Sequence, residues 1–474
     1  MAKKEKKEKK VKQIKPKKEK VKKTKKKKEK HILGKGEFIF NFISLVCMIG
    51  MGIYFGYRSL YYYSKQNQQY QEEAQTLNGY IMQHVPVNYE EGDGLHHDSL
   101  GYYFKGNVSN NYVSFANRIF RIIRINEDNS VKLVLDSNTA IFPWGDPVHF
   151  NESNLYFWLN KTDWEYSGYY YNTLPNVEDF LVKTSYKENT LQEGEIVESD
   201  KEYQEYITLL GINDYVQANG MSSYLNIGKM FFLLGLNGEE SNLYVEEDGS
   251  IQTCETTEGR GIRPVITLKP NTVITGGEGT KENPYVIYQG DKTNMIASYV
   301  KMGDDIWQIF YQNGDDLKLH LNGYIQENGA EKSIFYSQTN SIYDIMNAEN
   351  IGYYLNHDYL GSLPYINILQ PFSSYVGEIS DDKGYQYATI YGEVVQSHVS
   401  LLNVFDPFFN QELSDFFRVN NTSPVGSMEY VTYSSGLLGE ADVREEKHIV
   451  PVVSIKKDSI KSGTGSLSDP YLVG

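Results

Sequence analysis

Residues that could do chemistry are scattered in this chain rather than gathered in motifs. His96, His97 and Asp98 are adjacent, but neighbouring side chains of a strand point to opposite faces and rarely bind one metal ion together. Asp304–Asp305 and Asp315–Asp316 fall where turns favour aspartate, and no twelve-residue calcium loop surrounds them. We therefore predict no metal site and interpret the two histidines as linker residues.

Catalytic motifs are missing from the sequence as well. It holds no G-x-S-x-G, no H-E-x-x-H and no P-loop. The two cysteines are Cys47, within an apolar run, and Cys254, so we expect no disulfide within the chain. A pair of carboxylates for glycoside hydrolysis needs a shared cleft, which the order of acidic residues along the chain does not reveal. We predict no catalytic residue and no cofactor.

Aromatic residues gather between positions 142 and 171, a window that holds three of the four tryptophans. Exposed rings of this kind suit sugar rings or peptide partners. Trp158 aligns with Tyr354 of a later, similar stretch, and we interpret it as a core residue. Trp144 and Trp164 have no such counterpart. We predict a ligand-binding surface that includes Trp144, Trp164, Tyr166 and Tyr169.

The elements that position these residues begin with an uncharged apolar run from Phe38 to Tyr57. About 20 helical residues span the ~30 Å core of a bilayer. No small-residue cleavage site follows the run, which argues against a removed signal peptide. We predict a transmembrane signal anchor at 36–60, preceded by a disordered Lys-rich tail at 1–35 and followed by a helical stalk at 61–85.

Charge indicates the orientation of this span. Residues 1–30 contain 18 Lys and 4 Glu, whereas the whole chain has a net charge of −15. Lys-rich flanks stay in the cytoplasm, where they face the anionic inner leaflet of the membrane. The remainder is strongly acidic, which argues against binding nucleic acid. We predict a single-pass protein of the cell membrane with a cytoplasmic N-terminus and an extracellular C-terminal bulk; a large outer part without disulfides fits a Gram-positive bacterial surface.

Two similar stretches follow the stalk. The sequence YVSFANRIFRII from Tyr112 matches YVKMGDDIWQIF from Tyr299, and each leads through a polar turn into a second strand with alternating apolar residues. The sequence GIRPVITL from Gly261 likewise matches HIVPVVSI from His448. We expect the opening hairpin and the closing strand of each stretch to lie in one sheet.

These matches predict an α+β fold. After the transmembrane helix we expect a linker at 86–99 and then two tandem repeats of a mixed, mostly antiparallel β-sheet domain with a few helices, at 100–288 and 296–474. A second linker would occupy 289–295.

The repeated pattern resembles a family of uncharacterised Firmicutes surface proteins, which are membrane-anchored and carry tandem domains. The resemblance rests on the opening YVxF and on the closing GIRPVI…GxGTxxNPY, which here runs from Gly261 to Tyr285. It implies an anchored protein of the cell surface. The opening and closing also resemble a C-type-lectin-like fold, to whose G-x-R ending only Gly261 and Arg263 correspond. No catalytic residue carries over.

The sequence thus predicts a membrane-anchored cell-surface binding or envelope-structural protein, with a glycan, cell-wall component or protein as ligand. Two alternatives stay open: an extracellular enzyme acting on cell-wall or glycan polymers, and a tethered subunit of a secretion or envelope machine. Titratable groups with shifted pKa values in one pocket would favour the enzyme. We expect the first repeat to carry the binding surface, with residues 370–391 of the second as the alternative.

Overall fold

The structure is a computed structural model that divides into two compact units, residues 1–69 and 70–474. The described residues are 35–73, 75–145, 148–163, 167–238, 241–289, 294–376, 394–410, 412–419, 428–434 and 436–474. Below, residues 75–289 are called the first half and residues 294–474 the second half.

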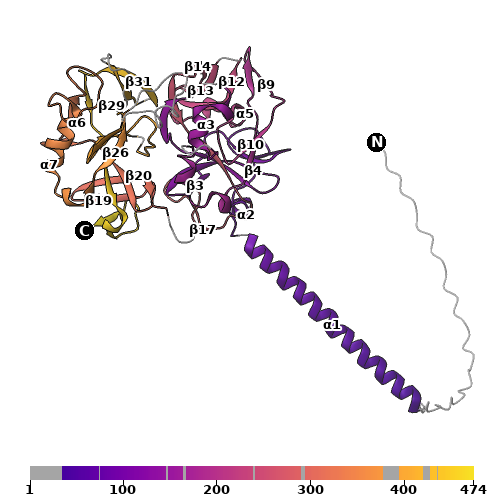
Figure 1. The fold of residues 1–474 in the computed structure, drawn as a ribbon. Coiled ribbons are helices and arrows are strands. Elements are labelled where there is room, and N and C mark those ends of the chain that lie inside the picture. Colours follow the sequence, from indigo (N-terminus) through magenta and orange to yellow (C-terminus); the bar gives the residue numbers. More distant parts are fainter. Residues whose placement is uncertain are drawn as a thin grey trace, which may run out of the picture. The chain divides into compact units, whose positions relative to one another are not determined.

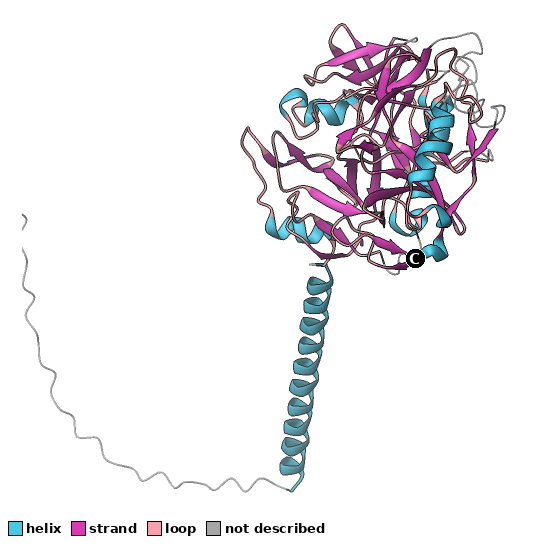
Figure 2. Ribbon diagram, turned by 90° about the vertical axis from the view of Figure 1, so that its left-hand side faces the viewer, coloured by secondary structure: helices cyan, strands magenta, loops and turns pink. Residues whose placement is uncertain are grey.

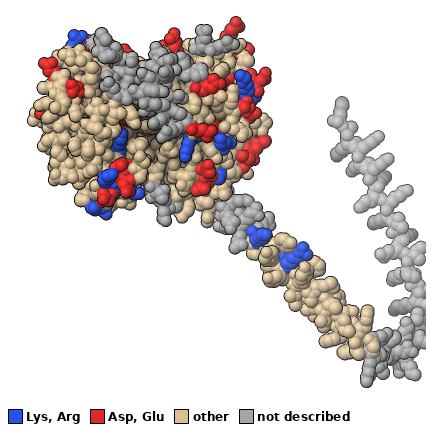
Figure 3. Space-filling model, viewed as in Figure 1, with Lys and Arg blue, Asp and Glu red and all other residues tan. Residues whose placement is uncertain are grey.

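Helix α1 (Lys35–Glu73) carries the apolar run. An 18-residue window within its stretch from Phe38 to Lys65 has a mean hydropathy of 2.1, and none of that window is buried by protein. The stretch is long and apolar enough to cross a membrane. In Figure 3, charged side chains appear on the described part of α1 only towards its C-terminal end. The prediction of one apolar helix of membrane-spanning length is confirmed. The helix continues past residue 60 without a break, because no proline or capping residue interrupts it there.

The predicted stalk and first linker are partly wrong. Helix α2 (Leu77–His84) begins at Thr76, whose hydroxyl accepts a hydrogen bond from the backbone N–H of Gly79, and it buries Leu77 and Ile81. The backbone N–H of Leu77 donates to the carbonyl of Thr272, so α2 belongs to the packed unit rather than to a free stalk. Within the predicted linker at 86–99, strand β1 forms an antiparallel hairpin with β2.

In the packed unit, residues in strands far outnumber residues in helices, and the helices are short (Figure 2). Figure 1 places the strands of the first half beside those of the second. Helices of the two halves after α2 are α3 (Asn154–Leu159), α4 (Val177–Phe180), α5 (Ile212–Gln217), α6 (Ile351–Tyr354) and α7 (Leu360–Ser362). Strands of the first half are β1 (Gly94–Asp98), β2 (Gly101–Lys105), β3 (Tyr112–Phe115), β4 (Arg118–Asn126), β5 (Val131–Leu135), β6 (Ala140–Pro143), β7 (Thr184–Tyr186), β8 (Thr190–Gln192), β9 (Glu195–Val197), β10 (Tyr203–Glu205), β11 (Ile207–Leu209), β12 (Phe231–Asn237), β13 (Ser241–Val245), β14 (Ile251–Cys254), β15 (Gly259–Ile262), β16 (Pro264–Leu268), β17 (Ile274–Gly276) and β18 (Tyr285–Ile287). Strands of the second half are β19 (Tyr299–Met302), β20 (Asp305–Asn313), β21 (Asp316–Leu321), β22 (Gln326–Glu327), β23 (Ala330–Glu331), β24 (Ser333–Phe335), β25 (Leu369–Gln370), β26 (Phe372–Tyr375), β27 (Val394–Ser397), β28 (Val399–Leu401), β29 (Phe416–Phe417), β30 (Met428–Thr432), β31 (Leu437–Asp442), β32 (Glu446–His448), β33 (Pro451–Lys456), β34 (Ile460–Ser462) and β35 (Tyr471–Val473).

Each half contains a sheet with the same strand order. In the first half the order is β11-β16-β5-β4-β3-β18-β17, and in the second half β28 pairs with β33 and the path continues β21-β20-β19-β35-β34. The parallel pair occupies the same place in both, since β18 lies parallel to β3 and β35 parallel to β19. The prediction that each opening hairpin shares a sheet with its closing strand is confirmed.

The closing GxG motif makes the same contacts in both sheets. The carbonyl of Gly279 accepts a hydrogen bond from the backbone N–H of Tyr112, and that of Gly465 accepts one from Tyr299. Both glycines have φ of +77°, and a Cβ on either would lie within 2.5 Å of the following tyrosine ring. Glycine is therefore required at this turn, because it alone allows both the backbone conformation and the close approach.

A further sheet joins the two halves. Its main path is β14-β13-β12-β15-β31-β30-β29-β32-β24, in which Gly259 and Arg260 of β15 pair with Leu438 and Leu437 of β31. The hydrophobic core of the first half also includes side chains of the second half, such as Phe405. The halves thus form one compact unit. Of the predicted linker 289–295, residues 290–293 lie outside the described residues.

Candidate functional site

The predicted aromatic surface does not form as expected. Trp144 is 0% exposed, packs between the rings of Phe150 and Phe232, and donates a 3.0 Å hydrogen bond from Nε1 to the carbonyl of Val148. The prediction that this ring lies outside the core is wrong, because Phe232 of β12 and Phe150 pack against it. The prediction that Trp158 is core is confirmed, since it is also 0% exposed.

Of the other predicted site residues, Trp164 and Tyr166 lie outside the described residues. Tyr169 is half-buried and lines a pocket. One member of the predicted set therefore reaches a cavity, and it does so at the boundary between the two halves rather than on an exposed face.

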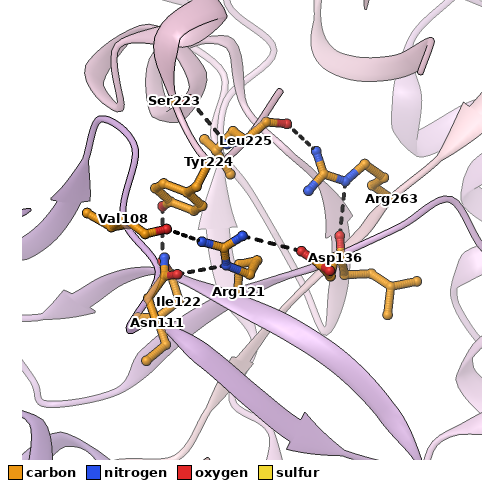
Figure 4. A network of polar contacts seen from close by, with 10 residues as sticks. Val108, Asn111, Arg121, Ile122, Asp136, Ser223, Tyr224, Leu225 and Arg263 are labelled. Carbon is orange, nitrogen blue, oxygen red and sulfur yellow. Dashed lines mark hydrogen bonds and ion pairs between the residues drawn. The ribbon is translucent and has the colours of Figure 1, made fainter. Parts of the chain in front are cut away.

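The first half contains a buried polar network (Figure 4). Arg121 donates to Asn111 Oδ1 at 2.7 Å and to the carbonyl of Val108 at 2.7 Å, and it lies 3.5 Å from Asp136. Arg263, the arginine of the G-x-R sequence, donates to two backbone carbonyls, and its burial lowers its pKa to about 10. Since protein groups already bind both guanidinium groups, this network is structural.

The pocket between the halves has a volume of about 550 Å³, which is the size of small-molecule sites in proteins. It takes most of its lining from the second half, including Phe372, Ser374 and Tyr375. These three belong to the alternative region 370–391, of which residues 377–391 lie outside the described residues. Its aromatic lining residues are Tyr169, Phe310, Tyr311, Phe372, Tyr375 and Phe405, and its amide-bearing ones are Asn172, Gln312, Asn313 and Asn403.

Lys318 is the cation of this pocket. It lies on β21, half-buried, with Nζ 5.1 Å from the ring centroid of Phe372 and 5.4 Å from that of Tyr311. Nζ donates one hydrogen bond of 3.0 Å, to the backbone carbonyl of Ser373. Burial lowers the pKa of Lys318, and the negative charge of Asp406 partly opposes this shift.

Asp406 is the anion of the pocket and follows β28. Its Oδ2 accepts a 2.8 Å hydrogen bond from the backbone N–H of Asn403. Burial raises the pKa of Asp406, while Lys318, the Asn403 amide and Arg418 act in the opposite direction. Arg418 is 0% exposed and donates at 3.2 Å to the Asn403 carbonyl, so a second cation supports the segment that carries Asp406.

The first half contains a corresponding lysine and aspartate. Lys132 and Lys318 occupy the same place on β5 and β21, because Lys132 pairs with Thr267 and Lys318 with Ser454 of the equivalent strands β16 and β33. Asp214 lies five residues after the end of β11, and Asp406 lies five residues after the end of β28.

The two pairs differ in geometry. Nζ of Lys132 lies 2.6 Å from Oδ2 of Asp214. No ion pair joins Lys318 to Asp406, and both of these described residues line the pocket instead. In the first half the lysine and the aspartate are therefore in direct contact, whereas in the second half the equivalent two charges are separated and line a cavity.

Comparisons with protein-family models, curated proteins and solved structures found no match to this chain. Among the described residues, no group of three or more His, Cys, Asp or Glu side chains is arranged to hold a metal ion. His96 instead lies in β1 next to the backbone carbonyl of Gly92, and Asp98 forms an ion pair with Arg124.

Sequence reasoning missed Lys318 and Asp406. A signal for Lys318 existed, because matching the alternating apolar residues of the second hairpin strands, Val131 with Leu317 and Leu133 with Leu319, also places Lys318 against Lys132. Asp214 lies in a helix and Asp406 in a turn. No local sequence pattern therefore identifies the two aspartates as equivalent.

Proposed function

We propose that this protein is a membrane-anchored binding protein of the cell surface, whose ligand occupies the pocket between the two halves. The observation that carries the proposal is the separation of Lys318 and Asp406 around the pocket, where the equivalent Lys132 and Asp214 touch. Two partly desolvated charges that form no ion pair are costly. Their retention beside aromatic and amide side chains is typical of a site whose ligand completes the contacts.

We also propose that the halves are two copies of one domain, in keeping with the resemblance to tandem surface domains. The matched strand orders support this. So does a repeated side-chain contact: Asn160 exchanges hydrogen bonds with the backbone of Ile207, and Asn356 does so with Val399. A duplicated frame lets one copy keep its ion pair for stability while the other copy opens for binding.

The location follows from the tail and the span. The Lys-rich residues before α1 favour the cytoplasmic side, next to anionic lipid, and the acidic unit after α1 then lies outside. Figure 3 shows basic side chains scattered among acidic ones on the visible face of this unit rather than gathered in a patch. Such a face supports a ligand other than nucleic acid.

An enzyme is the second candidate, because two titratable groups with shifted pKa values, Lys318 and Asp406, lie in one pocket. Glycoside hydrolysis uses two carboxylates, and Asp406 is the single carboxylate among the described residues that line this pocket. Structural charges also shift pKa values. We therefore favour binding over hydrolysis of glycan polymers.

Chemical labelling of Lys318 tests the proposal on the full-length chain in detergent micelles. An acetylating reagent reacts with neutral lysine, and the lowered pKa of Lys318 raises the neutral fraction of its amine relative to an unshifted lysine at the same pH. The probes are solubilised peptidoglycan fragments, chitin and cellulose oligosaccharides, free amino acids and short peptides. Mass spectrometry follows the acetylation rates of Lys318, of its ion-paired equivalent Lys132 and of the exposed Lys301.

We expect at least one class of probe to slow the acetylation of Lys318 severalfold and to leave Lys132 and Lys301 unchanged. Analysis of the probe after incubation separates the candidates, since a binding protein returns it intact and an enzyme returns a cleaved product. If every class leaves the rate at Lys318 unchanged, the pocket is not a ligand site and the proposal is wrong.

A further inference from the structure

We propose that the ligand of this pocket is a zwitterion of amino-acid or short-peptide type, whose carboxylate contacts Lys318 and whose ammonium group contacts Asp406. This inference rests on the proposed function, because it assigns a chemical class to the ligand of the same pocket. Two observations support it. Lys318 and Asp406 each have hydrogen-bonding capacity that the described residues leave unused, and the equivalent Lys132 and Asp214 of the first half form an ion pair.

Lys318 has room for an anion. An ammonium group has three N–H donors, and Nζ of Lys318 uses one of them, on the carbonyl of Ser373. The rings of Phe372 and Tyr311 stand beside Nζ and exclude water from that side. Among the described residues no carboxylate pairs with Nζ, so the anionic group of a ligand would be its first full counter-charge.

Asp406 has room for a cation. Oδ2 accepts the N–H of Asn403, and Oδ1 accepts no hydrogen bond from a described residue. The buried Arg418 supports the turn through the carbonyl of Asn403, and it donates there and to Thr432 rather than to the carboxylate. An ammonium group in the pocket would take the place at Asp406 that Lys132 takes at Asp214.

Ligands with one charge or none fit this arrangement less well. An anion without an ammonium group would meet Lys318 but also face the like charge of Asp406, and a cation would meet the reverse problem. A neutral sugar would leave both charges without a partner. A cavity of about 550 Å³ accepts a free amino acid or a short peptide, and its aromatic lining suits the apolar part of either.

Calorimetry on the full-length chain in detergent micelles tests the inference. The probes are the twenty free L-amino acids, di-alanine and tri-alanine, so that the free and peptide sources of a zwitterion are compared directly. For the tightest binder, two analogues are then measured, one without the ammonium group and one without the carboxylate. We expect each analogue to bind at least about tenfold more weakly than the zwitterion.

Two isosteric variants locate the contacts. Asp406→Asn keeps the acceptor for Asn403 and should weaken the zwitterion at least about tenfold. The same variant should not weaken the deaminated analogue, because it removes the like charge that this anion faces. Lys318→Met should show the converse pattern with the decarboxylated analogue. The matched control is Lys132→Met combined with Asp214→Asn, which removes the equivalent pair and should leave binding unchanged. A misfolded variant would bind none of the three ligands. A variant that loses affinity only for the ligands carrying one of the two charges must still have a folded pocket.

The outcomes separate this inference from the proposed function. The inference that the ligand is a zwitterion is wrong if the zwitterion and its analogues bind equally well. It is also wrong if each of the two variants weakens the binding of all three ligands equally. The same holds if a neutral oligosaccharide protects Lys318 from acetylation and no zwitterion does, in which case the pocket remains a ligand site. If no probe of any class protects Lys318, both proposals are wrong.

Discussion

Nε1 of Trp158 in the first half donates a 2.9 Å hydrogen bond to the carbonyl oxygen of Phe405 in the second half. Both side chains are buried, and the indole also meets the ring of Phe142 edge to face. Phe405 lines the pocket and precedes Asp406. The buried indole of one half therefore holds the segment that carries the anion of the other.

Replacing this indole should affect both stability and binding. Trp158→Phe removes the donor and some ring volume, so we expect a loss of about 2–4 kcal/mol in the free energy of unfolding together with weaker ligand binding. The control is Trp144→Phe, which also removes one bond from Nε1 to a carbonyl, here that of Val148, away from the pocket. Denaturant unfolding should show comparable losses for the two variants, and calorimetry should show weaker binding for Trp158→Phe alone. Equal binding by both variants would refute the positioning role.

The join between the halves depends on a glycine. A Cβ on Gly259 would lie 2.6 Å from the Cβ of Leu438, so Gly259→Val should push β31 away from β15 and destabilise the chain by about 1–3 kcal/mol. Gly323→Ala is the control, because nothing lies within 4 Å of a Cβ at that position. Thermal unfolding should show an earlier transition for Gly259→Val, and Leu438→Gly in the same chain should reverse it. A melting curve for Gly259→Val like that of the control would contradict the role of this pairing.

His320 predicts a pH dependence of stability. It is 0% exposed, and burial lowers its pKa from 6.5 to about 4. Between these two values the unfolded chain binds more protons than the folded chain, so stability is full above pH 6.5 and falls as the pH drops towards 4. The loss from this residue is on the order of 3 kcal/mol at most.

The measurement compares denaturant unfolding at pH 7.5 and 4.5 for the native chain and for His320→Val, which has the residue of the equivalent position Val134. The variant should lose less stability on acidification than the native chain. His97→Gln, which changes an exposed histidine, should behave as the native chain does. If His320→Val and the native chain lose the same stability, His320 is not the cause.

The orientation of the chain can be checked with protease on intact cells. Because Lys-rich flanks stay in the cytoplasm, the protease should remove the acidic bulk and leave an N-terminal fragment with the lysines and the span. After the membrane is opened with detergent, the tail should be cut as well. Protection of residues 75–474 in intact cells would place this unit inside and overturn the surface assignment.

Several features could be predicted from the sequence alone because local physics decides them. The apolar run from Phe38 needs no partner to be recognised, since its length and lack of charge match a bilayer. The opening hairpins follow from alternating apolar residues around polar turns. The repeated closing motif follows from turns in which only glycine fits, as at Gly279 and Gly465.

The tertiary structure decided the rest, because burial and distant pairing depend on which surfaces meet. Trp144 lacks a counterpart in the second half and yet is core, since β12 covers it. The two halves became one unit through the strand pair at Gly259 and Leu438, which no local pattern announces. Lys318 and Asp406 are ordinary residues in the sequence. They became a candidate site only when the packing of both halves left a cavity between charges that, in the first half, lie in direct contact.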